Sequence, residues 1–264
     1  MTTFSLGTIW EETIAFLRRE AALLIPVALA IFGPAQVLLS LGMAGAGTLR
    51  TTTGVAASAQ ILLTIPAAVL VLFGNLAISK TVLMPGSSVG EGLASAARRL
   101  SRSLGTMLLL ASAFIAVALA IVVAVILAAM VFSVDPRSKV IQDQIAGLVV
   151  VAMFILLIRL LLLVPVLAME NRSAAETIRR AWTLSRTNVL RFAAVWVLTL
   201  FLGVFIALIE QFVVGSLIAL IKLAVGDVEL LSAAETLINA GIQAMLSLAV
   251  AVYVALVYRK VALG

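Results

Sequence analysis

The sequence predicts an all-α integral membrane protein whose six transmembrane helices form three repeats of a cytoplasmic amphipathic helix and a transmembrane hairpin. Its composition predicts the membrane, because 64% of the 264 residues are hydrophobic and only 11% are charged. A soluble domain averages roughly 45–50% apolar and 25% charged residues. The repeat is predicted by helix-capping motifs and arginine pairs that recur about every 80 residues. We expect residues 1–264 to form a single membrane domain.

Six stretches without Asp, Glu, Lys or Arg supply the predicted spans. They are 21–49, 51–79, 103–134, 144–158, 192–209 and 236–258. The fourth extends to 169 if Arg159 is included, and the fifth extends to 221 if Glu210 is included. Each is then long enough to cross the hydrocarbon core, which takes about 20 helical residues. The external loops between them are too short for a separate domain.

The distribution of basic residues predicts the orientation. The N-terminus does not read as a cleavable signal peptide, because Glu11 and Glu12 precede the first arginine pair, and the first span is therefore expected to remain. Thirteen of the eighteen Lys and Arg residues fall on one side of the membrane, in 1–20, 80–103, 170–191 and 259–264, and four fall on the other. Cytoplasmic loops carry such an excess. Both termini are therefore predicted to be cytoplasmic.

Each predicted repeat opens with a capping box, in which a hydroxyl and a carboxylate satisfy free N–H groups at a helix start. The boxes are Thr8–Glu11, Ser88–Glu91 and Ser173–Glu176, followed by Arg18-Arg19, Arg98-Arg99 and Arg179-Arg180. The arginine pairs are 80 and 81 residues apart, and Pro85 and Pro165 are also 80 apart. We expect repeat units of approximately 4–85, 86–169 and 170–264, related by a pseudo-threefold arrangement.

The amphipathic segments supply the first group of candidate functional residues. In the second segment, Val89, Leu93, Ala96 and Leu100 form one apolar stripe, as helical periodicity requires. A basic helix of this kind is typical of the headgroup region, where its arginines face anionic lipid. The candidates for binding lipid or a protein partner are Arg98, Arg99, Arg102, Arg159, Glu170, Arg179, Arg180 and Arg186. The alternative is that these helices only fix the topology and pack on the bundle.

Polar residues inside the spans form the second group, because burial of a charge in a membrane is expensive. They are Asn75, Arg159 and Glu210. Arg159 either reaches the cytoplasmic side and pairs near a helix end, or contacts a lipid headgroup or substrate. Glu210 either marks the external end of the fifth span, with Phe212–Leu223 bent along the surface, or acts as a coupling carboxylate. Their different depths argue against a direct pair. Asn75 and Gln243 are expected to form hydrogen bonds between helices.

The residue types that catalysis needs are largely missing. The sequence has no His and no Cys, which removes imidazole and thiol chemistry and most zinc sites. It also has no phosphate-binding loop and no carboxylate pair at helical spacing within a span. We therefore expect no enzymatic activity, no metal and no cofactor. Nucleic acid is not an expected partner either, because the positive charge belongs to one membrane face.

Residues 159–187 carry the one motif that resembles a known family. The matching residues are Arg159, Pro165, Glu170, Arg180 and Trp182. This pattern resembles the membrane domain of the glycerophosphoryl diester phosphodiesterase membrane-domain family and related six-span bacterial inner-membrane proteins of unassigned function. Members usually have Ser before the Trp, where this chain has Ala181. In that family the phosphodiesterase is a separate soluble domain, so the resemblance implies a module of the bacterial inner membrane without phosphodiesterase activity.

Two functions follow from these observations. The first is a non-enzymatic inner-membrane module that engages lipid, above all anionic lipid, or a protein partner through its basic interfacial helices. The alternative is a transporter or flippase-like protein for a lipid or a small anionic or amphipathic substrate, with a polar path near Arg159, Asn75 and Glu210. The few polar groups in the spans favour the first function. A solvated cavity that reaches the middle of the membrane would favour the second.

Overall fold

The computed structural model describes residues 6–48, 55–84, 86–131, 135, 138–186, 188–226 and 229–262, which form helices and short connections without a strand. The helices are α1 (Leu6–Thr48), α2 (Val55–Leu83), α3 (Val89–Val131), α4 (Lys139–Arg159), α5 (Leu163–Met169), α6 (Ala174–Arg186), α7 (Val189–Ile209), a π-helical turn η1 (Glu210–Gly215), α8 (Ser216–Val225) and α9 (Glu229–Ala262). Among the described residues, six helical segments are long and apolar enough to span a membrane. The predicted class, an all-α multi-pass membrane protein, is confirmed.

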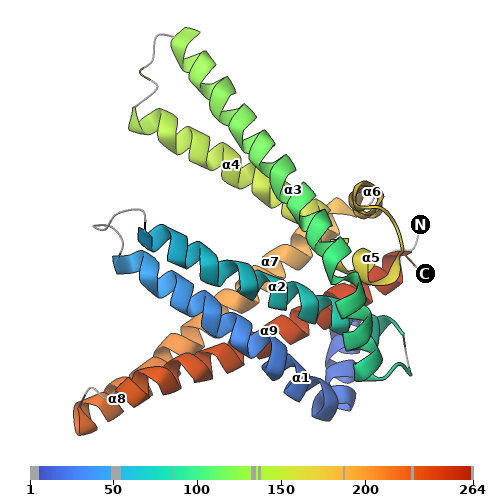
Figure 1. Ribbon diagram of the computed structural model, residues 1–264, viewed down its shortest axis with the longest axis vertical. Helices are drawn as coiled ribbons and strands as arrows, with labels where there is room; N and C mark the ends of the chain where they lie inside the picture. Colours follow the sequence, from blue (N-terminus) through green and yellow to red (C-terminus); the bar gives the residue numbers. More distant parts are fainter. Residues whose placement is uncertain are drawn as a thin grey trace.

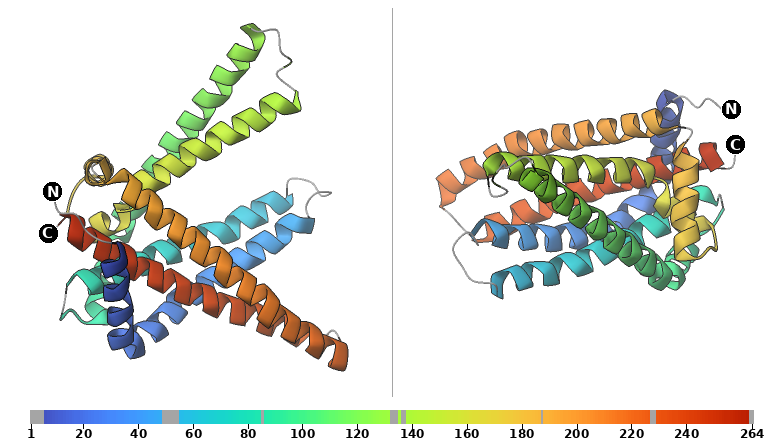
Figure 2. Two further views of the ribbon diagram at one scale, coloured as in Figure 1. Left: turned by 180° about the vertical axis from the view of Figure 1, so that it is seen from behind. Right: turned by 90° about the horizontal axis from the view of Figure 1, so that it is seen from above.

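Three helical hairpins diverge from one common end of the molecule (Figure 1). They are formed by α1 with α2, α3 with α4, and α7–α8 with α9. The start of α1 and the end of α9 lie together at the common end, near α5 and α6 (Figure 2). We call this the basic end and define it by the described residues of 6–20, 80–103, 159–191 and 259–262, which carry most of the basic side chains.

The three predicted amphipathic segments all lie at the basic end, but they are joined to the spans in two ways. α1 and α3 each continue without a break from the amphipathic segment into the span. α6 is instead a separate helix that lies across the end of the spanning helices (Figure 2). The first turns of α1 also run at a steep angle to the rest of that helix.

Two of the three predicted capping boxes are confirmed. In the second, the Ser88 hydroxyl accepts from the Glu91 N–H at 3.2 Å, and the Glu91 carboxylate accepts from the Ser88 N–H at 3.2 Å. The corresponding distances for Ser173 and Glu176 are 3.4 and 3.1 Å. The first box is wrong, because α1 begins at Leu6 and Thr8 therefore lies inside the helix.

The three hairpins agree with the layout that the repeat predicts, whereas the correspondence of the three units stays a prediction. Two elements depart from a strict repeat. α4 ends at Arg159, and a turn over Leu160–Leu162 separates it from α5, whereas α2 runs unbroken to Leu83. Pro85, the expected counterpart of Pro165, lies outside the described residues.

The hydrophobic core lies toward the basic end and is centred on α9. Every residue from Ala251 to Tyr258 is buried, so this part of α9 is enclosed on all sides, as expected for a helix that is apolar all round. Phe32 of α1 and Phe192 of α7 are fully buried in the same core. By contrast, α3 exposes apolar side chains such as Leu108 and Leu119, as expected for contact with lipid chains.

The fifth span does not end at Glu210. α7 passes through η1 directly into α8, and the three form one long rod beside α9 (Figure 2). The interpretation in which the span stops and Phe212–Leu223 bends along the surface is therefore wrong. The reason is that the Glu210 carboxylate accepts a hydrogen bond from Gln243 of α9, so the polar residue is satisfied within the helix pair.

Candidate functional site

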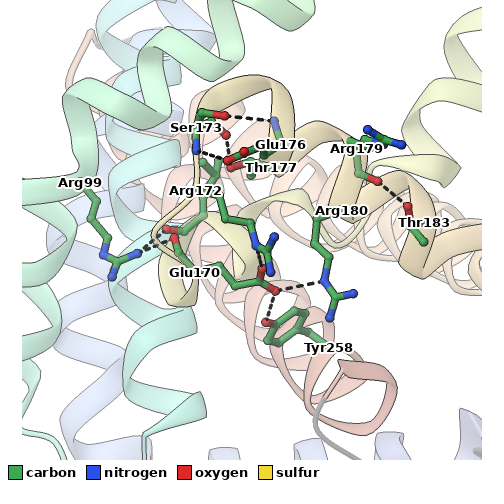
Figure 3. A network of polar contacts seen from close by, with 11 residues as sticks. Arg99, Glu170, Arg172, Ser173, Glu176, Thr177, Arg179, Arg180, Thr183 and Tyr258 are labelled. Carbon is green, nitrogen blue, oxygen red and sulfur yellow. Dashed lines mark hydrogen bonds and ion pairs between the residues drawn. The ribbon is translucent and has the colours of Figure 1, made fainter.

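Glu170 is the centre of a polar network at the basic end (Figure 3). It follows α5 directly, and the buried residues Leu163, Val166 and Leu167 fix that short helix in the core. Its carboxylate accepts hydrogen bonds from the Tyr258 hydroxyl at 3.1 Å, from Arg180 Nε at 3.4 Å and from Arg172. Glu170 therefore links the loop before α6 to α6 itself and to α9.

Arg99 of α3 attaches the second hairpin to the same network. One of its terminal nitrogens donates to the carbonyl oxygens of Leu167 and Glu170, both at 3.0 Å (Figure 3). These carbonyls end α5, where a cation is favourable because the helix dipole is negative there. The neighbouring Arg102 contacts the Asn171 side chain. Arg99, one member of the predicted Arg98-Arg99 pair, therefore attaches α3 to the end of α5.

The polar network also controls the charge of two carboxyls. Burial alone would raise the pKa of Glu170, but the hydrogen bonds from Arg172 and Tyr258 and the nearby charge of Arg180 outweigh it and hold that pKa below its usual 4.5. The hydrogen bond from the Ser173 backbone lowers the pKa of Glu176 as well. Both carboxyls are therefore ionised at neutral pH and stabilise the start of α6.

Acid should weaken the attachment of α6. Because the folded-state pKa of Glu170 is lowered, its stabilising effect is fully present above pH 4.5 and is lost as the pH falls through the lower folded-state value. We expect the melting temperature of the wild type to fall in this acidic range. Glu170→Gln should remove the Glu170 part of this dependence and leave the part that arises from Glu176. An unchanged pH profile in Glu170→Gln would contradict the assignment.

α6 packs on the bundle with one face and exposes the other. Thr177, Ala181 and Ser185 are buried at helical spacing, whereas Trp182 on the outer side is 41% exposed. The Arg159 guanidinium, at the end of α4, lies 5.1 Å from the centroid of the Trp182 ring, in cation–π distance. One terminal nitrogen of Arg159 is buried without a hydrogen-bond partner among the described residues. Arg159 thus contacts α6 and not Glu210.

The remaining arginines of the candidate group point outward. Arg98 and Arg102 on α3 and Arg179 and Arg186 on α6 are exposed. The structure therefore divides the predicted group. Arg99, Arg180 and Glu170 hold the elements together, and Arg159 contacts Trp182. Arg98, Arg179 and Arg186 present positive charge at the surface of the basic end, and Arg102 is exposed there as well but contacts Asn171.

No family model, no curated protein and no solved structure matches this chain. The resemblance of residues 159–187 to the glycerophosphoryl diester phosphodiesterase membrane domains therefore stays a prediction. Four of the residues that carry it form two contacts, because Arg180 pairs with Glu170 and the Arg159 guanidinium lies over the Trp182 ring. Their roles have to be argued from this geometry alone.

A second ion-pair group at the basic end was not predicted. Glu12 of α1 accepts from Arg259 at 3.0 Å and from Lys260 at 2.7 Å, so the first and last helices are fastened beside the termini. Tyr258 is the other residue that the sequence did not single out. Both contacts join residues far apart in the chain, and no local pattern marks them.

The two intramembrane amides behave differently from each other. Gln243 bridges α9 to Glu210 with a hydrogen bond of 3.1 Å, which confirms its expected role between helices. Asn75 instead donates to the Val71 carbonyl of its own helix at 2.8 Å, so the expected interhelical bond is wrong for this residue. Asn75 lines a mostly apolar cavity of about 360 Å³ together with Ser79 and Trp196.

Proposed function

We propose that this protein is a non-enzymatic membrane module that binds anionic lipid headgroups at its basic end. The observation that carries the proposal is the placement of α6, which lies across the end of the spanning helices with Arg179 and Arg186 exposed (Figure 2). The neighbouring Arg180 pairs with Glu170 and helps to hold α6 in place. The outward-facing Arg179 and Arg186 are therefore not needed to hold this helix. In this proposal the basic end faces the cytoplasm of a bacterial inner membrane, because basic residues concentrate on that side.

The energetics of lipid contact support this assignment. A Lys or Arg residue near an anionic leaflet contributes on the order of 1 kcal/mol, and the effect falls off within a Debye length. α6 lies where headgroups would surround it, and its exposed Trp182 is a residue type that favours the membrane interface. Arg98 on α3 adds a third outward charge at the same end.

The alternative function, transport or flipping of a lipid or small amphipathic substrate, is favoured by one separate observation. The cavity beside Asn75 is also lined by Leu160, Leu161 and Pro165, at the interruption between α4 and α5. Interrupted helices beside a cavity are a known feature of transporters. Movement of fluorescent phosphatidylglycerol between leaflets of reconstituted vesicles would favour this function, and its absence would favour the binding module.

Neutralising the outward arginines should weaken the retention of anionic lipid. We expect Arg98→Gln, Arg179→Gln and Arg186→Gln together to lower the affinity for phosphatidylglycerol by roughly tenfold or more, because three charges of about 1 kcal/mol each are removed. Native mass spectrometry of the purified protein would measure the bound lipid. The matched control is the Lys139→Gln, Lys222→Gln variant, which neutralises basic residues of the opposite end. Equal lipid retention in wild type and the triple variant would contradict the proposal and would mean that these arginines only fix the topology.

A further inference from the structure

The apolar cavity beside Asn75 lies where the three hairpins meet, before they diverge (Figure 1). Its volume is about 360 Å³, and α2, α3, α4, α5, α7 and α9 all contribute to its wall. The lining side chains are apolar apart from Asn75 and Ser79 of α2 and the indole nitrogen of Trp196. Sites for small molecules have volumes of roughly 300–1,000 Å³ and are mostly apolar with a few polar groups. This cavity therefore has the size and character of a binding site.

The interruption between α4 and α5 forms one wall of the cavity. The lining residues there are Leu160 and Leu161 in the turn and Leu163, Val164 and Pro165 in α5. Proline has no N–H group, so Pro165 cannot donate to the carbonyl of Leu161, as a continuous helix would require. The cavity is thus a consequence of a sequence feature that interrupts the fourth span.

The depth of the cavity places it within one leaflet of the membrane. Trp196 is seven residues beyond Val189, where α7 begins, or about 10 Å at 1.5 Å per residue. Val250 is nine residues before Arg259 on α9, or about 14 Å. Half of a hydrocarbon core that is about 30 Å thick measures about 15 Å. The cavity therefore lies at the depth of the lipid chains on the side of the basic end.

One edge of the cavity reaches the surface that faces lipid. Leu157 of α4 lines the cavity and is 37% exposed. The Trp196 indole donates to the Leu157 carbonyl at 3.0 Å and so joins α7 to α4 at this edge. An apolar cavity of this kind stays dry, and an empty one loses dispersion contacts on every side. Because the cavity is continuous with the lipid-facing surface, a hydrocarbon chain is the molecule that can enter and fill it.

The two polar side chains on α2 indicate how such a chain is held. Asn75 donates one of its two amide hydrogens to the Val71 carbonyl at 2.8 Å, and the second remains as a donor. Ser79, four residues further along the same helix face, adds a hydroxyl donor. An ester carbonyl, which joins each acyl chain of a phospholipid to glycerol, accepts from such groups.

We propose that this cavity binds one acyl chain of a phospholipid from the leaflet at the basic end, with the ester of that chain at Asn75 and Ser79. The site recognises the chain and its ester, whatever the charge of the headgroup. It is therefore separate from the binding of anionic headgroups by the outward arginines, and the two proposals can fail independently.

Photolabelling from within the membrane tests the proposal. The full-length protein is reconstituted in vesicles of phosphatidylcholine that carries a diazirine on one acyl chain, irradiated, and mapped by mass spectrometry. Leu163, Ala251 and Val254 line the cavity and are only 3%, 4% and 9% exposed, so lipid outside the protein does not reach them. We expect label at these buried residues as well as at Leu108, which is 71% exposed. Label confined to exposed residues would overturn the proposal.

A variant that fills the cavity provides the second test. Val164→Phe adds an aromatic ring to the wall formed by α5, and we expect it to lose the label at Ala251 and Val254 but to keep the label at Leu108. Val150→Phe is the matched control, because Val150 is 66% exposed on α4 and does not line the cavity; it should be labelled like the wild type. Undiminished internal label in Val164→Phe would overturn the proposal, and the wild-type result decides it even if that variant does not fold.

Phosphatidylglycerol with the same diazirine separates the two lipid proposals. It should label the buried residues as phosphatidylcholine does, because the site recognises the chain. Internal label from phosphatidylglycerol alone would overturn a site that is independent of charge. Equal retention of anionic lipid by the wild type and the triple arginine variant, together with internal label from phosphatidylcholine, would contradict the headgroup proposal and support the chain site.

Discussion

Replacing Glu170 with alanine is expected to release α6 from the end of the bundle. The substitution removes the acceptor for Tyr258, Arg180 and Arg172 at once. Tyr258 is only 2% exposed, so its hydroxyl would be left without a partner, whereas both arginines can turn to solvent and contribute little. We expect a loss of roughly 2 kcal/mol, which corresponds to about a thirtyfold increase in local opening.

Hydrogen exchange of the α6 amides measures this opening directly. Exchange over Ala174–Arg186 should accelerate in Glu170→Ala, whereas the enclosed part of α9 should stay protected. Glu20→Ala is the matched control at the same end, because Glu20 pairs only with its neighbour Arg19 among the described residues.

A second variant separates the hydrogen bond from general disruption. Tyr258→Phe removes the hydroxyl that Glu170→Ala would leave buried, so the double variant should exchange more slowly than Glu170→Ala alone. If Glu170→Ala leaves the exchange of α6 unchanged, the polar network does not hold this helix.

The six spans could be predicted from the sequence because membrane insertion depends on local composition. A helix that is long enough to span the membrane has to be apolar along its own length, so it is visible in the sequence as a long stretch without charged residues. The capping boxes at Ser88 and Ser173 are local in the same sense, since both partners lie within one turn. Thr8 shows the limit of such a motif, because a short pattern does not exclude a helix that starts earlier.

The polar sites could be predicted only in part, because their partners come from other helices. Glu170 and Tyr258 are 88 residues apart, and Glu12 and Arg259 are 247 apart. Glu210 suggested a span boundary because it lies far along the fifth span and is followed by Gln211 and Gly215. The partner is Gln243 of α9, 33 residues away. The pairing of α9 with η1 also brings Glu235 to a cavity that Glu210 and Gln243 line.

Enlarging Gly74 should separate the first two spans. Gly74 lies on α2, where a Cβ atom would be 2.6 and 2.8 Å from carbons of the Phe32 ring and 3.1 Å from an Ile31 methyl. The Phe32 side chain is 0% exposed, so the ring has no free space into which it could turn. Small residues let helices approach closely in membranes, where packing replaces the hydrophobic effect as the driving force. Gly74→Leu should therefore destabilise the α1–α2 hairpin by about 3 kcal/mol.

The melting temperature in detergent would report this loss, with a decrease of roughly 6–12 °C for a chain of this size. Gly147→Leu is the matched control on α4, because nothing lies within 4 Å of a Cβ atom at that position. It should leave the melting temperature unchanged or slightly higher, since leucine is the better helix former. Phe32→Ala in the Gly74→Leu background should recover part of the loss, because the smaller side chain makes room for the leucine. Equal melting temperatures for Gly74→Leu and Gly147→Leu would show that Phe32 does not pack against Gly74.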